Sequence, residues 1–94
     1  MQKIGVIIPA YNEALSIKKV ITKIPSLADE ILVINNGSTD ETQIKAISAG
    51  ATVLNEPKKG YGHACLCGIN YFNNLTEPPE IIVFLDGDYS DYPE

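Results

Sequence analysis

The 94-residue sequence contains no tryptophan, one histidine, two cysteines and no long apolar run. So few thiols and imidazoles exclude a disulfide scaffold and leave too few ligands for a zinc centre. Cys65 and Cys67 stand two apart in an expected helix, where such neighbours point in different directions, so we interpret them as packing residues in a reducing compartment. No apolar stretch approaches the roughly 20 residues of a membrane-spanning helix. The N-terminus has no signal-peptide pattern, and we predict a cytosolic protein, with membrane association of a longer full-length protein as the open alternative.

Basic residues are also scarce and scattered, with 7 Lys and Arg against 12 Asp and Glu and a net charge of -5. Because a phosphate backbone is neutralised by clustered cations, this pattern excludes nucleic acid as the expected partner. The apolar fraction of 45% and the charged fraction of 20% are typical of a folded globular protein. The length suits one small domain or part of a larger one.

Short apolar runs rich in Ile and Val indicate strands at Ile4–Ile8, Ile31–Ile34 and Ile81–Leu85, with a weaker one at Thr52–Leu54. The runs are continuous rather than alternating, which predicts strands covered on both faces, as in a parallel sheet. Apolar spacing predicts helices over 15–24, over 44–49 less cleanly, and over about 63–73. We therefore expect an α/β fold, a Rossmann-like, mostly parallel sheet with flanking helices.

Two local signals refine the second helix. Ser38, Thr39 and Asp40 are good N-cap residues, and Gly50 is a good helix stop.

The loops richest in polar groups follow the predicted strands, as PAYNE (9–13), NNGSTD (35–40) and DGD (86–88). Ligands of open parallel sheets bind beyond the carboxyl ends of the strands, where these loops converge. In extended backbone Asp86 and Asp88 point the same way and suit one divalent cation, Mg²⁺ or Mn²⁺, while Gly87 permits close backbone approach. The alternative interpretation of the pair is a solvated acidic turn.

Two further segments allow a structural and a functional interpretation. NNGSTD forms a turn and helix cap, to which contacts with a nucleobase or ribose would be an addition. The segment Lys58 to Gly62 is predicted to be a mobile glycine loop, either solvated or close to a diphosphate, and it does not match a P-loop. His63 is interpreted as a helix-start residue rather than a general base.

Taken in order, VIIPAYNE, DEILVINNGSTDET, GATVLNEPKKGYGHACLCGI and IIVFLDGDYSDYPE resemble the nucleotide-sugar-binding half of family 2 glycosyltransferases, which have the GT-A fold. The likeness covers nearly the whole chain. The last two segments are most similar to the polyprenyl-phosphate (dolichyl-phosphate) mannosyl and glucosyl transferases. The resemblance implies a nucleotide-diphospho-sugar donor, a divalent cation, and inverting transfer to a polyprenyl phosphate or a glycan.

The resemblance also implies roles for individual residues. Asp86 and Asp88 would hold the metal, Ser90 falls where a further metal-site ligand is possible, and Asp91 is a flank or cap. The expected donor-binding residues are Pro9, Ala10, Tyr11, Glu13, Asn35, Gly37, Ser38, Lys59, Gly62, Asp86, Gly87 and Asp88.

The sequence departs from the family pattern at two places. Asn35 stands where the family usually has Asp, so a charge-assisted hydrogen bond is lost and we expect an altered nucleotide preference. The sequence stops just after the metal motif, so the general base and the acceptor site are expected beyond residue 94. We therefore expect residues 1–94 to be one donor subdomain, truncated at its C-terminal end and inactive alone. Its exposed sheet edge invites self-association.

The sequence alone is also compatible with two other functions. A nucleotidyltransferase also uses a Rossmann-like sheet and metal-binding acids, but it usually carries a basic glycine-rich loop where this sequence has PAYNE. A non-catalytic nucleotide-binding or interaction module would use the acidic cluster only as a solvated turn.

Overall fold

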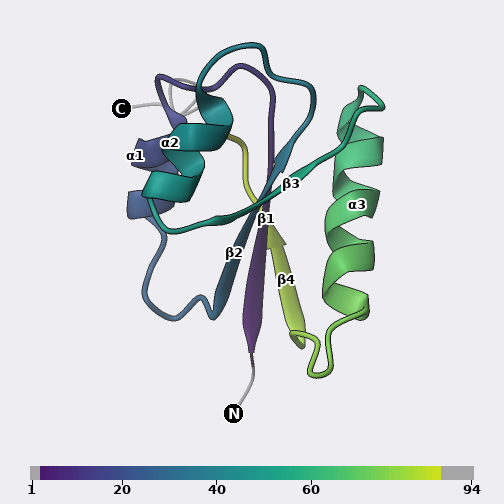
Figure 1. Cartoon of the computed structure of the whole chain (residues 1–94). Helices are drawn as coiled ribbons and strands as arrows, with labels where there is room; N and C mark the ends of the chain where they lie inside the picture. The colour runs from purple at the N-terminus through teal and green to yellow at the C-terminus, as the bar shows by residue number, and fades with distance from the viewer. Residues whose placement is uncertain (1–2, 88–94) are drawn as a thin grey trace.

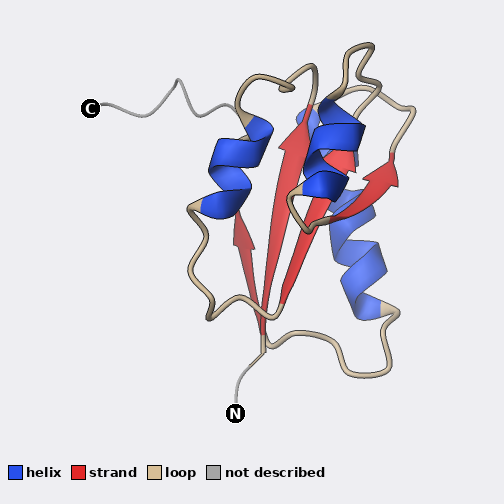
Figure 2. Cartoon of the chain, turned by 60° about the vertical axis from the view of Figure 1, so that its left-hand side comes forward, coloured by secondary structure: helices blue, strands red, loops and turns tan. Residues whose placement is uncertain are grey.

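The computed structural model describes residues 3–87, which form a four-stranded parallel sheet with helices on both faces (Figures 1 and 2). The strand order is β3-β2-β1-β4. The helices α1 and α2 lie on one face and α3 lies on the other (Figure 1). This arrangement confirms the predicted α/β class. The elements are β1 (Ile4–Ala10), α1 (Ile17–Thr22), β2 (Glu30–Asn35), α2 (Thr42–Ser48), β3 (Thr52–Asn55), α3 (Tyr61–Asn73) and β4 (Ile81–Phe84).

The central strand β1 divides its side chains between two cores. Val6 and Ile8 pack with α1 and α2, whereas Ile7 packs with Phe72 of α3. Side chains alternate across a strand, so a strand with apolar residues at every position fills both cores at once. The prediction of strands buried on both faces is thus confirmed for β1 and for β2, where Leu32 is also fully buried.

The same prediction is wrong for β4. Ile81, Val83 and Phe84 remain 38%, 38% and 40% exposed. The reason is its position, since β4 is an edge strand and pairs only with β1 within residues 3–87. An apolar run therefore predicted the strand but not the extent of its cover.

The first helix is shorter than its apolar pattern, and the second exposes part of its apolar face. Leu15 is 95% exposed and precedes α1, which begins at Ile17. In α2 the side chains of Ile44 and Ile47 are exposed, and Ala46 and Thr42 are its buried residues. Each of these helices is only about two turns long and packs against the sheet with a narrow strip of its surface. Part of the apolar face that the sequence predicted is therefore exposed to solvent.

Local backbone geometry sets the ends of α2 and α3. Gly50 has φ +101° and ends α2, as predicted. Gly60, with φ +123°, precedes α3, which starts at Tyr61. Gly62 consequently lies in the first helical turn rather than in the predicted glycine loop, and His63 lies in the same turn. No helix among residues 3–87 has the length and apolarity needed to cross a bilayer.

A glycine allows α3 to lie close against the sheet. A Cβ atom placed on Gly68 would stand 2.8 Å from both the Cδ1 and the Cγ2 atoms of Ile7. This close approach fixes α3 against β1, and with it the position of Tyr61 at the start of the helix.

Candidate functional site

The carboxyl ends of β1, β2 and β4 meet at one edge of the sheet and border a polar cleft of about 270 Å³. Six of the predicted donor-binding residues line it together. Two residues that were not predicted complete the lining. The full lining is Pro9, Ala10, Tyr11, Glu13, Asp86 and Gly87, with Asn36 and Tyr61.

The loop after β1 is held by side chains from the loop after β2. Asn12 donates its N–H to Ser38 Oγ (2.9 Å), and Glu13 donates its N–H to Thr42 Oγ1 (2.8 Å). In return, Thr39 donates its N–H to Asn12 Oδ1 (2.8 Å). Asn12 has φ +53°, a left-handed conformation that asparagine tolerates. The wall of the cleft is therefore fixed by hydrogen bonds between two loops distant in sequence.

Asp40 joins the same network. Its carboxylate accepts the N–H groups of Thr42 (3.0 Å) and Ala14 (3.2 Å), together with the Thr42 hydroxyl. Burial acts to raise the pKa of Asp40, but these hydrogen bonds outweigh it and hold the pKa below its usual value. Asp40 thus accepts the N–H of Thr42, the first residue of α2, and also ties the first loop to the second. The N-cap position itself is Glu41, whose side chain makes no capping hydrogen bond, so the N-cap predicted among Ser38, Thr39 and Asp40 is placed too early.

Asn35 and Asn36 are both buried, but their side chains form hydrogen bonds with different segments of the chain. Asn35 donates its amide to Asn55 Oδ1 (2.9 Å) and Gln43 Oε1 (3.4 Å), and its Oδ1 accepts the N–H of Ser38 (3.2 Å). It does not line the cleft, so its role toward a nucleotide stays a prediction. Asn36 lines the cleft in its place.

Lys59, in the segment between β3 and α3, does not line the cleft itself but contacts Tyr11, which does. Its Nζ donates to Tyr11 Oη (3.2 Å) and lies 4.3 Å from the centroid of the Tyr11 ring. Gly37 has φ +87°, and a Cβ atom there would lie 3.3 Å from Lys59 Cε. Of the remaining predicted residues, Ser38 serves the wall of the cleft and Gly62 lies in the first turn of α3.

The acidic motif is held close to α1. Ser16 Oγ donates to the carbonyl oxygen of Gly87 (2.6 Å). A Cβ atom on Gly87 would lie 3.2 Å from Glu13 Cγ and 3.3 Å from Ala10 Cβ, so glycine permits this approach. The adjacent Asp86 is exposed at the cleft.

The oxygen ligands present are of the type that suits Mg²⁺ or Mn²⁺. Asp86 supplies one exposed carboxylate at the cleft. Asp88 and Ser90 lie outside the described residues, and within 3–87 no three His, Cys, Asp or Glu side chains gather as a ready metal cluster. The pairing of Asp86 with Asp88 on one cation therefore stays a prediction.

Tyr61 and Asn36 were missed by the sequence reasoning. Tyr61 occupies the first position of α3, in a stretch read as a loop. Burial, the Cys65 thiol and the negative charge of Asp86 raise the pKa of Tyr61, so its phenol keeps its proton. Asn36 follows Asn35 directly, and only the phase of the strand pleat determines which of the two meets the cleft.

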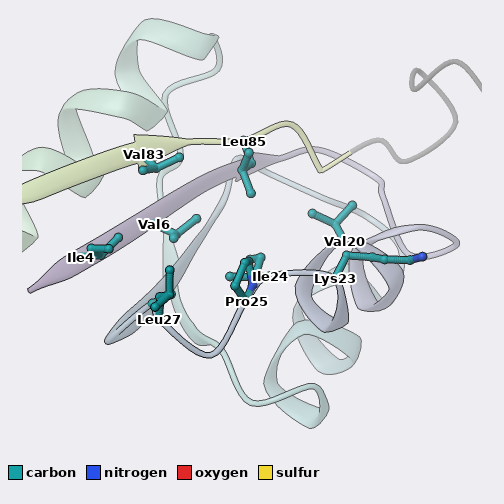
Figure 3. A pocket seen from close by; sticks show the side chains of 10 residues that line it. Ile4, Val6, Val20, Lys23, Ile24, Pro25, Leu27, Val83 and Leu85 are labelled. Carbon is teal, nitrogen blue, oxygen red and sulfur yellow. The ribbon is translucent and has the colours of Figure 1, made fainter.

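A second hollow, of about 420 Å³, lies between α1 and the β4 side of the sheet (Figure 3). Its surface is almost wholly apolar, and the amine of Lys23 points away from the other side chains (Figure 3). Such a surface offers no partners for a diphosphate or a ribose. We call it the apolar groove, and it is lined by Ile4, Val6, Val20, Lys23, Ile24, Pro25, Leu27, Ala28, Val83 and Leu85.

Comparison with known proteins places this geometry among glycosyltransferases. The model of the family described as Glycosyl transferase family 2 matches residues 5–94. A glucosyl-3-phosphoglycerate synthase of Mycobacterium tuberculosis (strain CDC 1551) is 34% identical over 97 residues, which cover 90% of this chain and 28% of the relative. An uncharacterized glycosyltransferase of Mycobacterium bovis is 36% identical, covering 93% of this chain and 37% of the relative.

Solved structures agree with the sequence matches. The M. tuberculosis glucosyl-3-phosphoglycerate synthase in complex with Mn²⁺, UDP-glucose and glycerol 3-phosphate aligns with TM-score 0.80 and 33% identity. The alignment covers 93% of this chain and 34% of that chain. The same enzyme with Mg²⁺ and UDP aligns with TM-score 0.77 and 32% identity, with the same two coverages. This chain thus spans about a third of the length of the curated relatives it matches.

Proposed function

Because this chain belongs to glycosyl transferase family 2 and has the GT-A fold, we propose that residues 1–94 form the donor-binding part of a metal-dependent glycosyltransferase. The observation that carries the proposal is the polar cleft at the carboxyl edge of the sheet. There Tyr11 and Glu13 from the loop after β1 meet Asp86 from the loop after β4. Solved relatives with the same fold bind Mn²⁺ or Mg²⁺ together with UDP.

The proposed donor is a nucleotide-diphospho-sugar. In this proposal Pro9, Tyr11 and Glu13 frame the nucleoside, and Asp86 and Asp88 hold the divalent cation. The cation, when bound, would neutralise negative charge on the diphosphate as the sugar leaves. Lys59 is close enough to Tyr11 to place a second positive charge beside the same diphosphate. The chain's own contribution is therefore to bind and orient the donor.

The proposed acceptor carries a phosphate group. The sequence resemblance implies a polyprenyl phosphate or a glycan, whereas the M. tuberculosis glucosyl-3-phosphoglycerate synthase was solved in one complex with phosphoglyceric acid and in another with glycerol 3-phosphate. These compounds share a phosphate with polyprenyl phosphate but have no lipid. We place the acceptor site and the general base outside residues 3–87. Direct attack by an acceptor oxygen would invert the configuration at the anomeric carbon.

We also propose that a second copy of this chain pairs with the free edge of β4. Ile81 and Leu85 donate their N–H groups to carbonyl oxygens of Lys3 (3.1 Å) and Ile7 (3.0 Å). In a parallel pair, alternate residues bond to opposite sides, so Ile82 and Phe84 direct their backbone groups away from β1. Among residues 3–87 no strand pairs with that side.

An antiparallel pair centred on Val83 satisfies these outward groups in both copies. Ile82 of one copy then exchanges hydrogen bonds with Phe84 of the other, and the reverse pair forms by symmetry. Val83 and Leu85 also line the apolar groove, so the same partner would shield apolar surface beside the edge.

Thermal unfolding tests the donor proposal. A ligand that binds only the native state stabilises it by about 2.7 kcal/mol at a concentration a hundredfold above its Kd. For a domain of this size, that corresponds to a rise in Tm of roughly 10 °C or more. UDP or GDP together with Mn²⁺ should give this rise, and EDTA should abolish it. An unchanged Tm with both nucleotides would contradict the proposal and favour a module that does not bind nucleotides.

A further inference from the structure

Asn36 is a buried polar residue whose side chain serves a segment far along the chain. Only 7% of its surface is exposed, and it lines the cleft. Its Nδ2 donates to the carbonyl oxygens of Glu56 (2.9 Å) and Lys58 (2.8 Å), and its Oδ1 accepts the N–H of Gly60 (3.0 Å). Two carbonyl partners and one N–H partner fix the orientation of the amide, because a carbonyl only accepts. Asn36 therefore binds the backbone of 56–60 at three points.

The segment that Asn36 holds carries Lys59. The Lys59 ammonium donates to Tyr11 Oη at 3.2 Å and lies 4.3 Å from the ring centroid, and Tyr11 lines the same cleft. Gly37, next to Asn36, leaves room for the lysine, since a Cβ atom there would lie 3.3 Å from Lys59 Cε. The end of β2 thus determines both the backbone position of Lys59 and the path of its side chain.

We propose that Asn36 is a positioning residue that holds Lys59 over the cleft, where its ammonium meets the diphosphate of the donor. This inference rests on the proposed function, because the diphosphate is the anion that Lys59 would contact. An aspartate at position 36 does not replace the asparagine. A carboxylate has no N–H for the carbonyl oxygens of Glu56 and Lys58, and it would face both with negative charge.

A double-mutant cycle tests this coupling with UDP and Mn²⁺ as the probe, measured by isothermal titration. Asn36→Asp and Lys59→Gln should each weaken binding about tenfold, which corresponds to the loss of one charge-assisted contact. Because Asn36 acts through Lys59, the loss of binding free energy in the double variant should be smaller than the sum of the two single losses. Any loss beyond that of Lys59→Gln alone reflects the new carboxylate, which lines the cleft and repels the diphosphate directly. The matched control is Asn74→Asp, which alters an exposed asparagine at the far end of α3 and should leave the Kd unchanged.

Two results would overturn the inference. One is an Asn36→Asp variant that binds UDP with the Kd of the wild type. The other is a double variant whose loss of binding free energy equals the sum of the losses in the two single variants. If Asn36→Asp does not fold, as judged by circular dichroism, Asn36→Ser takes its place in the cycle. Serine introduces no charge, and it keeps at most one of the two donated hydrogen bonds.

A second readout needs no nucleotide and separates this inference from the proposed function. The ε-protons of Lys59 lie near the Tyr11 ring, so their NMR resonances should be shifted upfield in the wild type. In Asn36→Asp they should move toward the values of an unstructured lysine, and in Asn74→Asp they should not. If UDP fails to bind the wild type, the proposed function fails. An unchanged Lys59 resonance in Asn36→Asp would contradict the positioning role in either case.

Discussion

The close contact between α3 and β1 predicts opposite effects for one substitution at two glycines of the same helix. In a helix interior, alanine is more favourable than glycine by up to about 1 kcal/mol. At Gly62 a Cβ atom meets nothing within 4 Å, so Gly62→Ala should be neutral or slightly stabilising. At Gly68 the new methyl would lie 2.8 Å from two atoms of Ile7, which is fully buried and has little room to move. Overpacking of this kind typically costs about 1–3 kcal/mol, so Gly68→Ala should lose about 1–2 kcal/mol overall.

Urea unfolding followed by circular dichroism measures both variants, and the difference between them should be about 2 kcal/mol. Ile7→Val supplies an internal check, because it removes Cδ1, one of the two atoms of Ile7 that the new methyl meets at 2.8 Å. Alone it should cost about 0.5–1.5 kcal/mol, and in the Gly68→Ala background it should cost less. A Gly68→Ala variant as stable as Gly62→Ala would refute the reasoning that this glycine sets the position of α3.

Three other predictions concern acid stability, self-association and the turn after β2. The pKa of Asp40 lies below its usual value of 3.8, so its contribution to stability is complete above that value and is lost as the pH falls through the lower folded pKa. Tm measured between pH 6 and about pH 2 should fall less steeply in Asp40→Asn, and an identical slope would exclude the carboxylate as a source of acid sensitivity. If β4 edges pair, light scattering should show a concentration-dependent dimer that Val83→Lys abolishes and Thr52→Lys, on the opposite edge, does not; a monomeric wild type would contradict the pairing. Gly37→Ala and Gly50→Ala, both at positive φ, should each cost about 1–2 kcal/mol. Of these two, only Gly37→Ala should also weaken UDP binding, because its methyl lies 3.3 Å from Lys59 Cε; equal binding by both variants would contradict this.

The sequence predicts the sheet well because continuous apolar runs have few structural solutions. The run at Ile4–Ile8 extends by two residues in the structure, and Ile31–Ile34 extends by one at each end. Once the strands are parallel, their carboxyl ends share one edge, so the sequence also places Tyr11 near Asp86 although 75 positions separate them. The convergence of these two residues is confirmed by the cleft that both line.

Burial and local phase were harder to predict. Helical periodicity shows that Ile44 and Ile47 share a face, but it carries no information on whether another element covers that face. The same limit applies to Val83, since the sequence of an apolar strand does not indicate whether the strand lies at the centre or at the edge of a sheet. Asn35 and Asn36 are identical neighbours at the end of β2, and only the phase of the strand pleat directs Asn36 rather than Asn35 to the cleft.

The most direct test of the account is isothermal titration of the wild-type chain with UDP in the presence of Mn²⁺. Binding should depend on the cation, and it should be lost in a variant with both Asp86→Ala and Asp88→Ala. Asp91→Asn, which changes a carboxyl of the same acidic motif outside the proposed metal pair, should bind as the wild type does. Equal heats from the wild type and the double variant would contradict the central claim that this cleft is a metal-dependent donor site.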